Sequence, residues 1–222
     1  NYLTTTRERY DVIISEPLNP WIGGLASLFS TEFFQLARSH LRAGGLMLQW
    51  LQGYSLYSDD FRMIVNTFRS VFPSVTIWNT IQGDYLLLGA LEPAPVDLLR
   101  VKERVQGNLR VQEDWDRLGL VGWAGPLGYF MLSDQDSARF AQGGGLNTDE
   151  RLPLEFSAPR ALYADTVGAN WNLLRSYQTE LVPPVTPDSE PELRQASPWY
   201  SMGVARSRSN PADALTLFER AL

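Results

Sequence analysis

The 222-residue sequence has no cysteine and a single histidine, His40. Without cysteine there are no disulfide bonds, thiolate metal sites or cysteine nucleophiles. One histidine argues against a His-based catalytic triad and against a multi-histidine metal site, so we expect no metal. Lysine and arginine total 19 against 25 aspartates and glutamates, for a net charge of -6. Because nucleic-acid binding needs a basic surface, we expect no nucleic-acid partner.

Long apolar runs are also missing. Hydrophobic residues make up 44% of the chain and charged residues 20%, which is typical of a globular protein. No run is long enough to span a bilayer, and no signal peptide opens the sequence. We therefore expect these residues to be cytoplasmic. The sequence starts at Asn1 without a methionine, and we expect a fragment or a processed piece of a longer protein.

Strand and helix patterns alternate over the first 90 residues. Apolar runs at 10–15, 46–50, 75–79 and 85–89 predict strands. Helical periodicity follows Ser30, a predicted N-cap, and ends at Gly44-Gly45; Ser58 is the predicted cap of a second helix. Gln82-Gly83-Asp84 is typical of a hairpin turn. The order predicts an α/β fold with a parallel sheet, an antiparallel last strand and a mainly helical extension.

Two loops leave the carboxyl ends of the predicted parallel strands, where open α/β folds place their ligands. They span residues 16–24 and 51–57. We expect residues 10–15 to form a central strand, with Glu16 at its tip facing an open crevice. Asp84 is interpreted as a hairpin residue.

Beyond residue 92 the sequence pattern changes. We predict the rear part of an α/β domain at 1–92, a helical and irregular extension packed on it at 93–181, and a proline-rich linker at 182–198. Residues 199–222 predict a helical hairpin. Its apolar spacing is either that of a tetratricopeptide-type repeat or a chance match, because one such unit cannot bury its own face.

Two segments carry a family resemblance. Residues 10–34, beginning Tyr-Asp-Val-Ile-Ile-Ser-Glu-Pro-Leu-Asn-Pro-Trp, resemble the spermidine synthase (polyamine aminopropyltransferase) family. Residues 146–160 resemble its long bacterial subgroup, in which a membrane region precedes the domain. The resemblance implies a class I methyltransferase-like, Rossmann-like sheet, of which this chain holds the rear half. It also implies that the glycine-rich cofactor motif lies upstream of Asn1.

The resemblance further implies site residues. Family members with synthase chemistry carry an Asp-x-x-Asp-Pro pattern, and the matching positions here are Glu16, Asn19 and Pro20. Glu16 is the expected catalytic carboxylate, which would orient an amine and accept its proton. Asn19 lacks the second charge of the pattern. The other expected site residues are the substrate-binding Asn19, Trp21, Gln49 and Tyr54 and the cofactor-contacting Pro17, each with turn formation or packing as the structural alternative.

Three functions follow from these observations. The first is an aminopropyl transferase that uses decarboxylated S-adenosylmethionine and a small amine. The second is a methyltransferase that uses S-adenosylmethionine and another acceptor. The third is a non-catalytic interaction module with a degenerate site, in a membrane-associated parent protein. A protein partner of the C-terminal helices and a homodimer both stay open.

Overall fold

The computed structural model describes residues 2–222, which divide into two compact units. The first unit comprises Asn1–Trp78, Gly83–Pro93 and Leu132–Thr179, and the second comprises Asn79–Gln82, Ala94–Met131 and Glu180–Leu222. All of the sequence-predicted site residues lie in the first unit.

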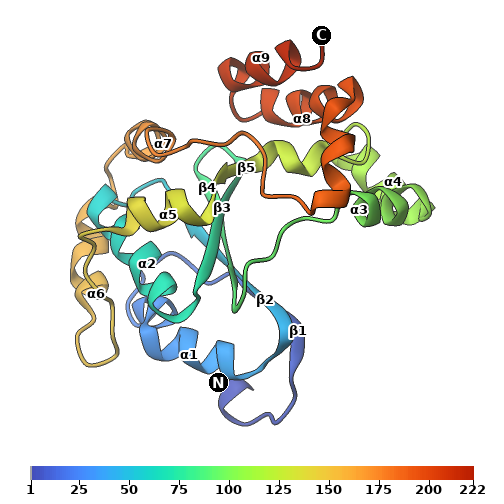
Figure 1. Cartoon of the computed structure of the whole chain (residues 1–222). Helices are drawn as coiled ribbons and strands as arrows, with labels where there is room; N and C mark the ends of the chain where they lie inside the picture. The colour runs from blue at the N-terminus through green and yellow to red at the C-terminus, as the bar shows by residue number, and fades with distance from the viewer. Residues whose placement is uncertain (1) are drawn as a thin grey trace. The chain divides into compact units, whose positions relative to one another are not determined.

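Figure 1 shows an open sheet, most of which belongs to the first unit. Its strands are β1 (Tyr10–Ser15), β2 (Leu41–Gln52), β3 (Ser74–Ile81), β4 (Asp84–Ala90) and β5 (Phe130–Leu132), in the order β1-β2-β4-β3-β5. β1 is parallel to β2, whereas β4 is antiparallel to β2. The predicted α/β class, with its antiparallel strand and helical extension, is therefore confirmed.

Several helices accompany the sheet in the first unit. They are η1 (Tyr2–Thr4), η2 (Ala26–Phe29), α1 (Thr31–Ser39), α2 (Ser58–Val71), α5 (Asp134–Ala141), α6 (Pro153–Ser157), η4 (Ala158–Ala161) and α7 (Val167–Arg175). Figure 1 shows α1, α2 and α5 on the same side of the strands. The predicted cap of α1 is confirmed, because the Ser30 hydroxyl accepts a hydrogen bond from the Phe33 amide at 3.2 Å.

Two predicted helix boundaries are wrong. α1 ends at Ser39, and Gly44-Gly45 lies inside β2, where the pairing with β1 shifts register. Gly44 has a φ of 72°, and a Cβ on Gly45 would meet backbone oxygens at 2.9 Å, so the glycines permit a bulge. Ser58 is the first residue of α2, and its hydroxyl donates to the side chain of Asn170 at 2.8 Å.

One face of the sheet is covered by helices. Tyr85 of β4 packs edge-on against Phe61 of α2, with ring centroids 5.1 Å apart. A Cβ on Gly89 would lie 2.7 Å from the Phe68 and Phe72 rings, so the glycine lets these rings reach the sheet. Each buried aromatic ring contributes about 1.5–3 kcal/mol, and this face provides the core of the unit.

The opposite face and the β1 edge are less covered. Strand pairing places Val12 and Ile14 on the same face as Leu46 and Leu48 of β2. Val12 is 53% exposed and Ile14 is 68% exposed. Our expectation that residues 10–15 form a central strand is wrong for residues 2–222, where β1 is the first strand of the sheet. A central position would require a further strand beside it.

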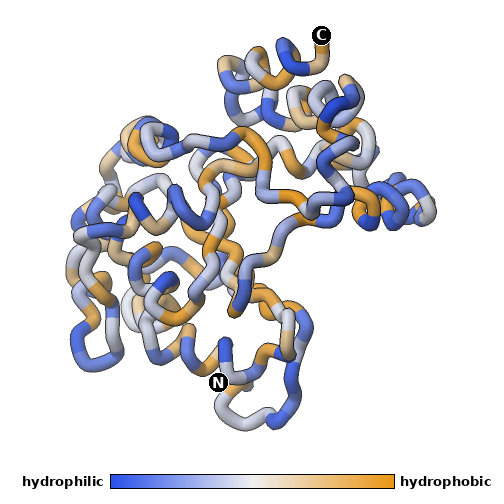
Figure 2. Tube along the Cα trace, viewed as in Figure 1, coloured by the Kyte–Doolittle hydropathy of each residue, from blue (hydrophilic) through white to orange (hydrophobic). Residues whose placement is uncertain are grey.

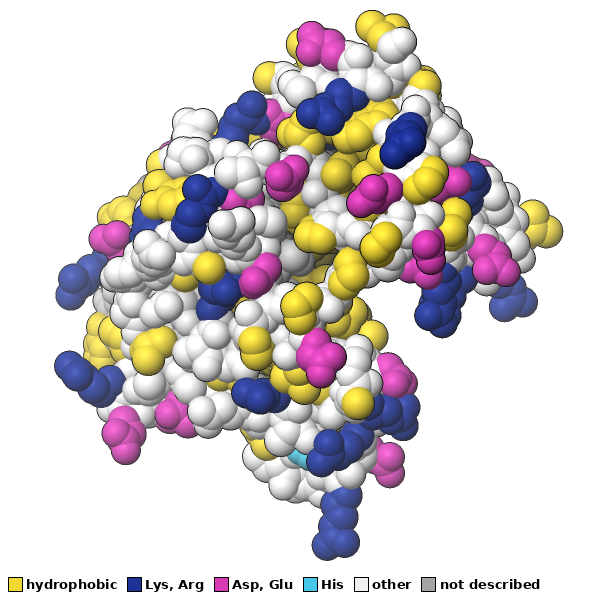
Figure 3. Space-filling model, in the orientation of Figure 1, with side chains coloured by type: hydrophobic (Ala, Val, Ile, Leu, Met, Phe, Trp, Pro, Cys, Tyr) yellow, Lys and Arg dark blue, Asp and Glu magenta, His cyan; other side chains and the backbone are white. Residues whose placement is uncertain are grey.

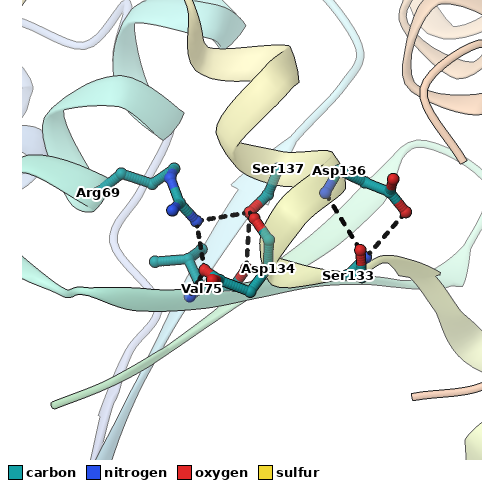
Figure 4. Close-up of polar contacts among 6 residues, drawn as sticks. All are labelled: Arg69, Val75, Ser133, Asp134, Asp136 and Ser137. Carbon is teal, nitrogen blue, oxygen red and sulfur yellow. Dashed lines mark hydrogen bonds and ion pairs between the residues drawn. The ribbon is translucent and has the colours of Figure 1, made fainter. Parts of the chain in front are cut away.

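A polar network fastens α5 to α2 and β3 (Figure 4). Arg69 of α2 donates to both Asp134 and Ser137, each at 2.7 Å. Asp134 also accepts from the Val75 amide at 2.8 Å, and the Ser137 hydroxyl donates to the Val75 carbonyl at 2.6 Å. Arg69 is 15% exposed and Ser137 is buried, whereas Asp134 is 46% exposed. The network joins α5 to α2 and β3.

The second unit is mainly helical. It contains α3 (Leu98–Gln106), α4 (Leu109–Leu118), η3 (Gly125–Tyr129), η5 (Pro187–Arg194), α8 (Ala196–Ser207) and α9 (Pro211–Glu219). α8 and α9 form the predicted hairpin, and Gly203 allows the Phe218 ring to approach, since a Cβ there would lie 2.5 Å from it.

The stretch predicted as a linker, 182–198, is ordered within the second unit. Val185 bridges to Val96, the Leu98 amide donates to Ser189 at 2.9 Å, and Lys102 pairs with Glu192 at 2.9 Å. The limits predicted for the extension and the hairpin stay predictions.

Surface properties agree with the composition. In Figure 2 the central strands are mostly coloured as hydrophobic, and in Figure 3 charged side chains of both signs are scattered over the visible face. Across residues 2–222, the longest and most apolar helices fall short of what a membrane crossing requires.

Candidate functional site

Glu16 follows the last residue of β1 and is exposed. Ser15 pairs with Gln49 of β2, so Glu16 emerges beside the carboxyl end of that strand. The alternation of side chains then puts Glu16 on the less covered face, together with Ile14 and Trp50. Glu16 thus lies at the tip of a parallel strand, as expected, but this strand is the first of the described sheet and not a central one. That Glu16 faces an open crevice stays a prediction.

Asn19, Trp21 and Tyr54 lie together. The Tyr54 hydroxyl donates to the Asn19 side-chain oxygen at 3.5 Å, and the Trp21 and Tyr54 rings meet edge-on with centroids 6.1 Å apart. The structure thus joins the two loops that the sequence predicted to surround the site. Pro17 is half-buried between Glu16 and this group.

The loop that carries Tyr54 has a strained backbone. Ser55 is the one non-glycine residue with a positive φ, 46°, among residues 2–222. Such backbone is uncommon outside glycine and is often found at functional sites. The Ser55 hydroxyl anchors the turn by donating to the Leu162 carbonyl at 2.9 Å. A Cβ on Gly83 would touch the Tyr54 ring at 3.4 Å, so the ring lies over the β3–β4 hairpin.

The sequence analysis did not assign Asp84 to the site. It begins β4 and lies directly opposite Gln52, the last residue of β2. Burial raises the pKa of Asp84, a hydrogen bond from the Trp50 side chain lowers it, and the nearby charge of Glu16 raises it. Burial and the charge of Asp84 raise the pKa of Tyr54, whereas its hydrogen bond to Asn19 lowers it. Glu16, Asp84 and Tyr54 therefore share one electrostatic neighbourhood.

The two glutamines of β2 lie on opposite faces. Gln49 pairs with Leu87, on the face that α2 covers, and its amide donates to the Trp50 carbonyl at 3.0 Å. The structure does not bring it to the Asn19–Tyr54 group. Gln52 lies with Asp84 on the other face and is fully buried. Neither atom of its amide has a hydrogen-bond partner among the described residues.

Residues 146–170 hold both site loops in place. Glu155 accepts from the Gly24 amide at 2.7 Å, and Asn147 donates to the Ala26 carbonyl at 2.8 Å. Asn170 donates to the Gly53 carbonyl at 2.8 Å. Polar side chains of this later segment thus hold the two loops by hydrogen bonds to their backbones.

The chemistry of the site favours a cation. Two carboxylates, a carboxamide and a phenol lie in this part of the structure, and groups of these kinds bind an ammonium well. Within the part of the chain that the structure describes, no group of three or more His, Cys, Asp or Glu residues could hold a metal ion. The donor set fits an amine, whereas nothing in it forms the glycine-rich turn that would hold a nucleoside cofactor.

Comparisons with known proteins give one family match and several distant relatives. Residues 1–86 match the model of the spermine/spermidine synthase domain. The chain is 26% identical over 121 residues to a polyamine aminopropyltransferase of Korarchaeum cryptofilum, covering 49% of this chain and 37% of that protein. It is 27% identical over 119 residues to polyamine aminopropyltransferase 2 of Hyperthermus butylicus, covering 50% and 39%. The chain thus spans about two fifths of the length of these relatives.

Among solved structures, the chain is similar to a probable spermidine synthase from Corynebacterium glutamicum. The TM-score is 0.46 and the identity 17%, over 67% of this chain and 50% of that one. The similarity to the spermine/spermidine synthase family rests on residues 1–86, which match the model of that domain.

Proposed function

We propose that the site at the tips of β1 and β2 binds the amine acceptor of an aminopropyl transfer, within a protein whose residues 1–86 match the spermine/spermidine synthase domain. One observation carries the proposal: a carboxylate, Glu16, emerges at a parallel strand end beside the joined Asn19–Tyr54 loops. Open α/β folds bind ligands at this edge.

Glu16 would act on the acceptor nitrogen. An ammonium cannot attack carbon until it loses a proton, and a carboxylate within hydrogen-bond reach can orient the amine and accept that proton. Asn19 and Tyr54 would position the amine by hydrogen bonds, and Trp21 would wall the site. When bound, decarboxylated S-adenosylmethionine supplies the electrophilic aminopropyl carbon. Pro17 is proposed to contact it, with the remaining contacts upstream of residue 1.

The test is an assay of the full-length protein with putrescine and decarboxylated S-adenosylmethionine. We expect release of methylthioadenosine, and a loss of at least about 100-fold in kcat/KM for Glu16→Gln. Asp59→Asn, at the first turn of α2, is the matched control and should stay within about twofold. An inactive wild-type protein would overturn the proposal.

Two other outcomes identify the alternatives. Transfer of a methyl group from ordinary S-adenosylmethionine, without aminopropyl transfer, would assign the site to a methyltransferase. Binding of neither cofactor by the full-length protein would leave an interaction module.

A further inference from the structure

We propose that Asp84 supplies the second carboxylate of this site, and that Glu16, Asp84 and Gln52 together bind one ammonium group of the acceptor amine. The inference rests on the proposed function and names its substrate class, a primary amine that is cationic in solution. The sequence alone did not indicate this role, because Asp84 follows a hairpin turn far along the chain from the Glu16 loop.

The first support is the geometry of the strands. β1 and β4 flank β2, so their backbones lie about 10 Å apart across it. Glu16 continues β1 past Ser15, and Asp84 begins the antiparallel β4, so both acids stand at the same end of β2. Side-chain alternation directs both to the less covered face. Glu16 continues β1 beside Trp50, and Asp84 lies opposite Gln52, two residues farther along β2. Two carboxylates at this end of the face can hold one ammonium between them.

The second support is independent of the acids. Gln52 is fully buried and both of its amide atoms lack a hydrogen-bond partner among the described residues. Leaving a buried amide unsatisfied costs about 1–3 kcal/mol per group. As the cross-strand partner of Asp84, Gln52 projects toward the same place, with Cβ atoms about 5 Å apart. Its Oε1 atom can accept from the same ammonium that the acids bind.

The third support is the site's own composition. Asn19, which occupies the place of the family's second aspartate, provides no charge, and its side chain is engaged with Tyr54. Asp84 restores a pair of negative charges at the site. Bringing two carboxylates together is unfavourable without a cation, and burial adds to the cost. A bound ammonium offsets both effects.

The experiment measures putrescine binding to the full-length protein by calorimetry. We expect Asp84→Asn to weaken binding by about 10–100-fold, the worth of a charge-assisted hydrogen bond. Asn can still accept from Trp50 and removes an unfavourable charge, so the melting temperature of the ligand-free protein should not fall. The rise in melting temperature on adding putrescine should be lost. If the role of Asp84 were purely structural, Asp84→Asn would lower the melting temperature of the ligand-free protein.

Controls separate charge from position. Glu92→Gln changes an exposed acid just past the other end of β4 and should leave binding within twofold. Gln52→Leu should weaken putrescine binding about 10-fold without lowering the melting temperature. In the double variant Glu16→Gln with Asp84→Asn, the loss should be smaller than the product of the single losses, since both acids hold the same group.

The two proposals fail differently. If transfer occurs but Asp84→Asn binds putrescine within twofold of wild type, the role of Asp84 is overturned while the proposed function stands. If Asp84→Asn weakens putrescine binding but the wild-type protein releases no methylthioadenosine, the binding role stands and the transferase function fails.

Discussion

The two faces of the sheet differ along a single strand. In β4, Tyr85 and Leu87 point to the side covered by α2 and are fully buried, whereas Leu86 and Leu88 point to the other side and are half-buried. The covered face ends in packed aromatic rings, and the other face ends in Glu16, Gln52 and Asp84. The first face buries the apolar core of the unit, while the second carries the polar groups of the proposed site.

The largest difference should appear when an apolar side chain is shortened on each face and the free energy of unfolding is measured. Leu87→Ala should lower the free energy of unfolding by about 2–5 kcal/mol, because it leaves a cavity under α2. Leu88→Ala, one residue along the same strand, should cost about 1 kcal/mol. Urea unfolding of both variants measures the contrast. Equal losses would show that both faces are equally packed.

Removing the charge of a buried, hydrogen-bonded acid should lower the free energy of unfolding. Asp136 lies in the first turn of α5, accepts from the backbone amide of the N-cap Ser133, and is fully buried. Burial raises its pKa, but hydrogen bonds from Thr179, Arg139 and Ser133 together bring the pKa below its ordinary value. Asp136→Asn should cost about 2–3 kcal/mol at pH 7 by urea unfolding. The exposed Asp116→Asn is the control, with a change under about 0.5 kcal/mol.

The pH dependence of this difference has a definite sign. The stabilisation by Asp136 should be complete above about pH 4 and should be lost as pH falls through its lowered pKa. Asp84, whose pKa is raised, should make stability fall as pH rises from about 4 through that pKa. Unfolding of the Asp136→Asn and Asp84→Asn variants between pH 3 and pH 7 should show opposite trends relative to wild type.

Removing the hydrogen bonds that hold the loop after β2 should have a smaller effect on the free energy of unfolding. Asn170→Ala removes hydrogen bonds to the Gly53 and Leu56 carbonyls and should cost about 2 kcal/mol. Hydrogen exchange should become faster in residues 53–58 first. Asn172→Ala, an exposed change on the same helix, should leave exchange there unchanged. If residues 53–58 keep their protection, Asn170 does not hold this loop.

The smallest effect should come from the open face. Asp84→Asn should not lower the free energy of unfolding at pH 7, because the variant retains the Trp50 hydrogen bond and loses a carboxylate whose pKa is raised by burial. A loss above about 1 kcal/mol would mean that Asp84 supports the hairpin rather than a ligand.

Local patterns predicted the elements well but some of their ends poorly. Apolar runs located β1, β3 and β4, although only β3 and β4 bury every second side chain. Gly44-Gly45 misled the prediction, because a helix end and a strand bulge both need the conformational freedom of glycine. Only pairing with β1 distinguishes them.

The residues of the proposed site were predictable from the sequence only in part. Glu16, Asn19, Trp21 and Tyr54 follow strand ends, and parallel strands bring such loops together. Choosing between Gln49 and Gln52 requires knowing which face the helices cover, and the sequence does not state this.

The sequence by itself determined the order of strands and helices, the strand-end carboxylate at Glu16 and the acidic, cysteine-free character of the chain. Those properties follow from local spacing and side-chain chemistry. The tertiary structure decided that β1 lies at one end of the described sheet, and that Asp84 lies near Glu16 and across from Gln52. Strand register and sheet order set these contacts, because they join residues whose separation along the chain carries no local signal.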